Sequence, residues 1–101
     1  MDAIRRIEEY TQGIEEEEFY RNYLVQYGVI RQLEIIGEAT KKISKETRDK
    51  HTHIPWNDIA GMRDKLIHDY FGVDIEQVWL TAKNDIPILQ TEIKETHNLL
   101  Q

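Results

Sequence analysis

The sequence contains no cysteine, which excludes a disulfide framework and a zinc site built on thiolates. Glycine and proline are also scarce, at five and two residues among 101, so the chain has few of the turn residues that β-rich domains need. No apolar run approaches the roughly 20 residues of a membrane-spanning helix, and the charged start MDAIRRIEEY is unlike a secretory signal. We therefore expect a single all-α, cytoplasmic domain over residues 1–101.

The charge is acidic overall but unevenly distributed. The formal net charge is −6, which argues against a protein that coats nucleic acid without specificity. Residues 41–50, KKISKETRDK, carry five basic and two acidic groups, whereas residues 15–18 read EEEE. The basic run has two interpretations: a solvated helix face, which is the more common, or a groove that binds RNA.

The first helix is predicted from hydrophobic spacing. Ile4 and Ile7 are spaced as on one face of a helix, which predicts a helix over residues 2–12. Gly13 follows at a position that suits the end of a helix.

A longer apolar pattern predicts a second helix over residues 16–46. Its apolar stripe is wide enough for two buried sides, one in the domain core and one against a partner. Gly37 lies inside this helix, where glycine costs about 1 kcal/mol relative to alanine. We expect Gly37 to allow the close approach of another helix. Residues 47–54 interrupt the pattern.

The later helices are marked by proline, aspartate and glycine. Pro55 suits the first turn of a third helix, which we expect to end just before Gly72. Asp74 can cap a fourth helix. Pro87 should kink that helix or restart it, with Asp85 as a possible new cap. Together these signals predict an up-down antiparallel bundle of about four main helices with a kinked last helix.

The stretch RDKLIHDY, residues 63–70, gathers the groups that can do chemistry. Asp64 and His68 are four apart and share a helix face, so Asp64 could hold the tautomer of the imidazole. Arg63 and Tyr70 share nearly the same azimuth, but Arg63 and His68 point roughly 140° apart. Bringing Arg63 and His68 together therefore requires a bent helix end or a second copy of the chain across a two-fold axis.

These residue types suit the cleavage of RNA by its own 2′-hydroxyl. Arg63 can bind phosphate and stabilise a charged transition state, and His68 can move protons near neutral pH. Tyr70 can stack on a base or donate a hydrogen bond. No metal or other cofactor is expected, since the sequence shows no close cluster of carboxylates of the two-metal kind. On spacing alone, structural roles are the more common explanation, including His68 as a cation at a helix C-terminus.

Two other patterns have simple structural interpretations. His51 and His53 flank Thr52, but no third ligand is evident, so a zinc site is a minor alternative. Glu38 and Lys42 are four apart and read as an ordinary ion pair along one helix.

The residues around RDKLIHDY resemble the HepT toxins of HEPN–MNT toxin–antitoxin pairs. The similarity runs over nearly the whole chain and is carried by IIGEATKKI at 35–43, IPWNDIAGMRDKLIHDYFGVD at 54–74, VW at 78–79 and DIPIL at 85–89. HEPN ribonucleases carry Arg, a polar residue, a short gap and His, which correspond here to Arg63, Asp64 and His68. The HepT branch adds a tyrosine two residues after the histidine, which is Tyr70 here.

The resemblance implies a HEPN-like helical bundle that forms a homodimer, with the two motifs facing each other in a cleft. It implies a metal-independent endoribonuclease with RNA as substrate, in which Arg63 and His68 are catalytic and Asp64 orients the histidine. It also implies an MNT nucleotidyltransferase antitoxin as partner, which neutralises the toxin by transferring AMP to Tyr70. Two alternatives remain open: a non-catalytic HEPN docking subunit for a nucleotidyltransferase, and a dimeric scaffold of a larger complex.

Overall fold

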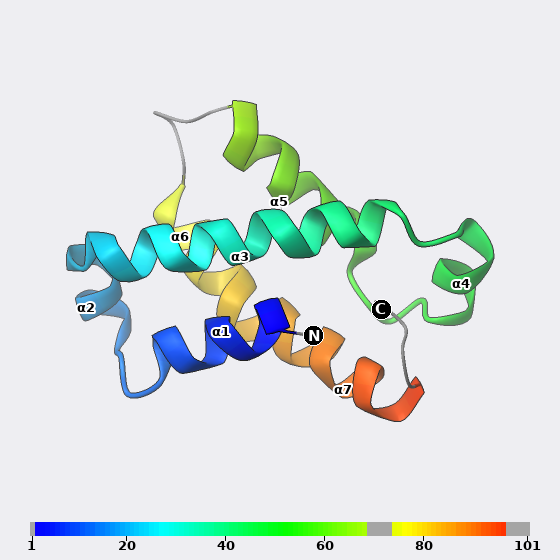
Figure 1. Cartoon of the computed structure of the whole chain (residues 1–101), viewed down its shortest axis with the longest axis horizontal. Helices are drawn as coiled ribbons and strands as arrows, with labels where there is room; N and C mark the ends of the chain where they lie inside the picture. Colours follow the sequence, from blue (N-terminus) through cyan, green and yellow to red (C-terminus); the bar gives the residue numbers. More distant parts are fainter. Residues whose placement is uncertain (1, 69–73, 97–101) are drawn as a thin grey trace.

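The computed structural model describes the backbone of residues 2–68 and 74–96 and the side chains of residues 2–64 and 74–92. This part of the chain is all-α and contains no strand, as predicted. Figure 1 shows the long helix α3 crossing the middle of the molecule, with α5 on one side and α1 on the other. The elements in chain order are α1 (Asp2–Thr11), α2 (Glu16–Arg21), α3 (Tyr23–Lys41), α4 (Lys45–Lys50), α5 (Trp56–His68), α6 (Ile75–Leu80), the π-helical turn η1 (Thr81–Asp85) and α7 (Ile86–Thr96).

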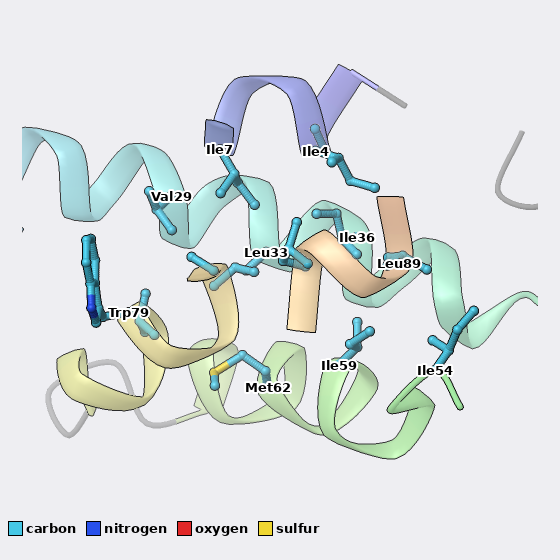
Figure 2. Close-up of a cluster of buried hydrophobic side chains, with 14 of the residues drawn as sticks. Ile4, Ile7, Val29, Leu33, Ile36, Ile54, Ile59, Met62, Trp79 and Leu89 are labelled. Carbon is cyan, nitrogen blue, oxygen red and sulfur yellow. The ribbon is translucent and has the colours of Figure 1, made fainter. Parts of the chain in front are cut away.

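The core forms around α3, which packs most extensively against α5 and next against α1. Figure 2 shows the buried apolar side chains that meet between these helices and the helical segment from α6 to α7. The largest fully buried ones include Ile4, Ile7, Phe19, Val29, Leu33, Ile36, Ile59, Ile86 and Leu89. No described helix combines the length and the apolar character that crossing a lipid bilayer requires.

Several predicted helix boundaries are confirmed. Gly13 follows α1 and has a φ of 72°, in the left-handed region that glycine adopts most readily. α5 begins at Trp56, directly after Pro55. The Asp74 side chain caps α6 by accepting a hydrogen bond from the Gln77 N–H at 3.1 Å.

The single second helix predicted over residues 16–46 is wrong. The helix is interrupted at Asn22, whose backbone is not helical. The Asn22 side chain caps α3 by accepting a hydrogen bond from the Val25 N–H at 3.1 Å. A further short helix, α4, begins after Ser44, whose hydroxyl accepts from the Thr47 N–H at 3.1 Å. The segment that appeared to interrupt the pattern is therefore partly helical. The predicted end of α5 just before Gly72 lies outside the described residues.

The last helix is kinked, as predicted, but it does not restart at Asp85. The Ile86 N–H donates to the Thr81 carbonyl five residues back, so the chain passes through a π-helical turn and continues into α7. Pro87 follows in the first turn of α7 and has no N–H to donate. A wider turn before Pro87 accommodates the missing hydrogen bond without ending the helix.

Gly37 lies where α3 crosses α5, as predicted. A Cβ atom at this position would overlap the Arg63 Cβ and would lie 3.2 Å from the Ile59 carbonyl oxygen. Because the Ile59 oxygen is backbone, it cannot move without shifting α5. Gly37 therefore sets the distance between the two helices.

We expect Gly37→Ala to lower the free energy of unfolding by about 1–2 kcal/mol, because the cost of overpacking exceeds the gain in helix propensity. Urea unfolding followed by circular dichroism measures the change. Gly61→Ala is the matched control: Gly61 lies inside α5, and a Cβ there would meet nothing within 4 Å. That control should stabilise the protein by up to about 1 kcal/mol. Equal effects of the two substitutions would contradict the close approach at Gly37.

Candidate active site

The RDKLIHDY stretch begins on the side of α5 that faces α3. Ile59 and Met62 are buried on α5, and Arg63 follows one turn after Ile59. The stem of Arg63 lies against Gly37, and its side chain is 27% exposed. The close approach of the two helices therefore brings the guanidinium to the surface of α3 instead of releasing it into solvent.

Four charged side chains link the two helices around Arg63. The Arg63 Nη2 lies 3.0 Å from the Glu38 Oε2, and the Arg63 Nη1 lies 3.2 Å from the Asp64 Oδ1. The same Asp64 oxygen accepts a hydrogen bond from the Lys41 Nζ. Each helix contributes one cation and one carboxylate, so this quartet is neutral as a whole. The two carboxylates fix the guanidinium between them.

The Lys41 ammonium, and after it the Arg63 guanidinium, lower the pKa of Asp64 below its ordinary value of 3.8 by hydrogen bonding to the carboxylate. Asp64 is therefore ionised at neutral pH and acts as a hydrogen-bond acceptor. Its described contacts are with Lys41 and Arg63. The predicted contact of Asp64 with His68 falls on a side chain outside the description and stays a prediction.

A surface hollow of about 410 Å³ lies directly beside Arg63. α3 lines it with Arg31, Glu34 and Glu38 on one helix face, and Lys42 lines it just past the end of α3. Arg31 pairs with Glu34 at 3.4 Å. With Arg63 the hollow carries three cations and two carboxylates, which is a suitable environment for one phosphate group.

The two remaining motif residues are placed only in part. His68 is the last residue of α5, and its side chain lies outside the description. Tyr70 lies outside the described residues altogether. Of the four predicted site residues, the structure therefore shows Arg63 and Asp64 in contact. The helix α5 that carries them extends as far as His68.

Glu38 and Lys41 belong to the site but were not predicted. Glu38 was expected to pair with Lys42, and that prediction is wrong: its described ion pair is with Arg63. Gly37 could have pointed to Glu38. A residue next to a glycine at a helix contact lies at the edge of that contact, where its side chain can reach the other helix. The partner of Glu38 could not be predicted, because it comes from a helix 25 positions further along the sequence.

The two histidines of the HTH stretch both contact the buried carboxylate of Glu92. The Glu92 Oε2 lies 3.0 Å from the His51 Nδ1, and the Glu92 Oε1 contacts the His53 Nε2. Across residues 2–64 and 74–92, no group of three or more histidine, aspartate or glutamate side chains is arranged to hold a metal ion. We call these three residues the His–Glu clasp; it joins the loop after α4 to α7.

The chain matches one family model and several curated proteins. A family model described as "Ribonuclease HepT-like" matches residues 1–96. Over 86 residues the chain is 54% identical to "Putative RNase MJ1216" of Methanocaldococcus jannaschii, a match that covers 85% of this chain and 71% of that protein. Over 94 residues it is 49% identical to "Probable ribonuclease HepT" of Thermococcus cleftensis, covering 93% and 86%. No solved structure matches significantly.

The His–Glu clasp predicts a pH dependence of stability. Hydrogen bonding, first to His53 and then to His51, lowers the pKa of Glu92 below its ordinary value of 4.5, although burial opposes the shift. The unfolded chain therefore takes up a proton at Glu92 before the folded chain does, so this contribution to stability is lost as the pH falls below 4.5. The free energy of unfolding, measured with urea at several pH values across that range, should fall less steeply with decreasing pH for Glu92→Gln than for the wild type. Glu17→Gln on exposed α2 is the control and should keep the wild-type slope.

Proposed function

Because the chain belongs to the HepT-like ribonuclease family, we propose that it is a metal-independent endoribonuclease toxin that cuts RNA at Arg63 and His68. The observation that carries the proposal is the guanidinium of Arg63, which Glu38 and Asp64 hold at the wall of a hollow large enough for a phosphodiester. A fixed guanidinium stabilises a charged transition state without having to reorganise during the reaction.

The proposed reaction is an attack by the ribose 2′-hydroxyl on the neighbouring phosphorus. The new bond joins the 2′-oxygen to phosphorus, and the bond from phosphorus to the 5′-oxygen breaks. One proton leaves the 2′-hydroxyl and one is delivered to the 5′-oxygen, so the products are a 2′,3′-cyclic phosphate and a 5′-hydroxyl. His68 moves protons at these oxygens, and Arg63 stabilises the extra charge on the phosphoryl oxygens.

We expect Arg63→Ala and His68→Ala each to lower the rate of RNA cleavage by about 10² or more with the fold retained. The assay is cleavage of total RNA in EDTA, with product ends identified by enzymatic end-labelling and mass spectrometry. Arg6→Ala is the control, since Arg6 is exposed on α1, away from the motif. Products with 3′-hydroxyl ends, or activity that requires an added metal, would refute this mechanism. A wild-type protein that cuts no RNA at any concentration would favour a non-catalytic docking subunit.

A homodimer would add the positive charge that the quartet around Arg63 lacks. The quartet of Glu38, Lys41, Arg63 and Asp64 has no net charge, whereas the transition state of the cleaved phosphate is doubly negative. A second copy across a two-fold axis would bring a second Arg63 and would solve the divergence of Arg63 and His68 on one helix.

Exposed apolar side chains on α3 support this dimer. Tyr23, Leu24 and Tyr27 are 69%, 83% and 62% exposed, although they lie on the helix that forms the centre of the core. They occupy the second side of the wide apolar stripe, for which the sequence predicted a partner. Burial of such a cluster is a common basis of homodimer interfaces.

We expect the wild type to be a dimer and Tyr23→Glu/Tyr27→Glu to be a monomer with little cleavage activity, because two buried charges would oppose association. Light scattering at micromolar concentration measures the mass. Ile88→Glu, on an exposed position of α7, is the control and should remain dimeric.

Mixed dimers of Arg63→Ala and His68→Ala chains show how the sites are shared. If each site takes Arg63 and His68 from different chains, the mixed dimer keeps one intact site and regains activity. A wild-type monomer would contradict the dimer.

We further propose that an MNT nucleotidyltransferase antitoxin neutralises the toxin by transferring AMP to Tyr70. The 5′-phosphorus of ATP would form a bond to the Tyr70 oxygen, with pyrophosphate leaving and the phenolic proton released. The support is the motif itself: Tyr70 is seven residues after Arg63, at nearly the same helical azimuth if α5 continues. The added phosphodiester would compete with RNA for Arg63.

Incubation with the cognate nucleotidyltransferase, ATP and Mg²⁺ should add AMP to the wild type at Tyr70 and none to Tyr70→Phe. Mass spectrometry of proteolytic fragments locates the label. Tyr70→Phe should keep some cleavage activity but escape neutralisation, because phenylalanine can still stack on a base. Labelling at Tyr10, Tyr20, Tyr23 or Tyr27 instead would show that the modified residue is wrongly assigned.

A further inference from the structure

The short helix α4 stands apart from the rest of the fold, because none of its six residues is buried. Its sequence, KETRDK, contains no apolar residue, so the helix contributes almost nothing to the core. Together with the turn before it, α4 carries the basic run of residues 41–50 in an otherwise acidic chain. Packing therefore does not explain why this element is basic.

Among the described residues, ion pairs occupy three of the five cations in the basic run of residues 41–50. Lys45 pairs with Asp49 at 3.0 Å, and Lys50 pairs with Glu46 at 3.4 Å, both within α4. Lys41 is used by Asp64 in the candidate active site. Among the described residues, Lys42 and Arg48 then have no carboxylate partner.

Both unpaired cations line hollows that border α5. Lys42 lines the same hollow as Arg63, just past the end of α3. Arg48 lines a second hollow, of about 570 Å³, between α4 and the start of α5, beside Trp56. Asp49, already paired with Lys45, and Asp58 also line this second hollow. Figure 1 shows that α4 lies at the end of the molecule to which the C-terminal end of α3 points.

We propose that Lys42 and Arg48 form a phosphate-binding track that holds the RNA strand outside the scissile position and leads it to Arg63. The inference rests on the proposed ribonuclease function and adds a binding surface to it. Lys42, beside Arg63, would contact a phosphate close to the cleaved bond, and Arg48 one further along the strand. Arginine and lysine are the side chains that most commonly bind RNA phosphates without reading the sequence.

The chemistry of the surface favours RNA over a membrane. Helices that bind anionic lipids combine basic residues with apolar ones that enter the bilayer, and α4 has none of the latter. Because Lys42 lines the same hollow as Arg63, the surface suits a ligand that also enters that hollow. RNA satisfies both conditions.

The test is the binding of a fluorescent, fully 2′-O-methylated single-stranded RNA, which lacks the attacking hydroxyl and cannot be cut by the proposed reaction. Affinity is measured by anisotropy over a series of KCl concentrations. Lys42→Gln/Arg48→Gln should weaken binding on the order of tenfold and lower the slope of log K against log salt by roughly 0.7 for each lost phosphate contact. Since α4 buries nothing, the variant should fold as the wild type does.

Arg6→Gln/Arg21→Gln is the matched control. It removes the same net charge from two exposed arginines on α1 and α2, and it should keep the wild-type slope. Equal losses in both variants would show that only the net charge matters and would overturn the track. No loss in Lys42→Gln/Arg48→Gln, or no RNA binding by the wild type, would overturn it as well.

Two further outcomes separate this inference from the proposed function. A wild type that binds the methylated RNA through Lys42 and Arg48 but never cuts unmodified RNA would refute the nuclease and keep the track. Binding to phosphatidylserine vesicles that the Lys42→Gln/Arg48→Gln variant loses, with its RNA affinity intact, would identify a lipid-facing surface and refute the track.

Discussion

The contact between Gly37 on α3 and the Ile59–Arg63 turn of α5 sets the position of Arg63 at the candidate site. Because Gly37 has no side chain, α5 lies close enough for the Arg63 stem to rest on α3. The guanidinium then reaches Glu38 on the next position of α3, while Asp64 reaches Lys41 one turn further on. A larger residue at position 37 would move two helices apart and would separate both ion pairs at once.

The interhelical ion pairs fix the position of the Arg63 guanidinium more than they stabilise the fold. Their side chains are partly exposed, and exposed pairs contribute little to the free energy of unfolding. An arginine free in solvent, however, would have to be ordered each time substrate arrives. Glu38 and Asp64 pre-order Arg63 at the cost of part of its positive charge, and Lys41 offsets that loss by neutralising Asp64.

Local signals in the sequence predicted the helical class, the end of α1 at Gly13, the cap at Asp74 and the close approach at Gly37. The family, recognised from IPWNDIAGMRDKLIHDYFGVD, is confirmed by the match over residues 1–96. The break at Asn22 was missed because its signal is a single capping side chain inside a continuous apolar stripe. The pairing of Glu38 with Arg63 and of the two loop histidines with Glu92 could not be predicted, since each depends on how distant helices cross. The assignments of His68 and Tyr70 stay predictions.

The ion pairs around Arg63 also limit the positive charge that a single chain offers to a phosphate. Glu38 and Asp64 hold Arg63 in place but offset part of its charge, so a phosphate that enters the hollow needs more positive charge than Arg63 alone supplies. The structure offers Lys42 at the rim of the hollow and Arg48 beyond it, and the exposed tyrosines of α3 offer a surface on which a second chain could bring a second motif. Both sources lie on or next to α3, the helix that also centres the core. In a site assembled from these parts, Lys42 and Arg48 would supply charge from the same chain as Arg63, and only the second motif would depend on a second chain.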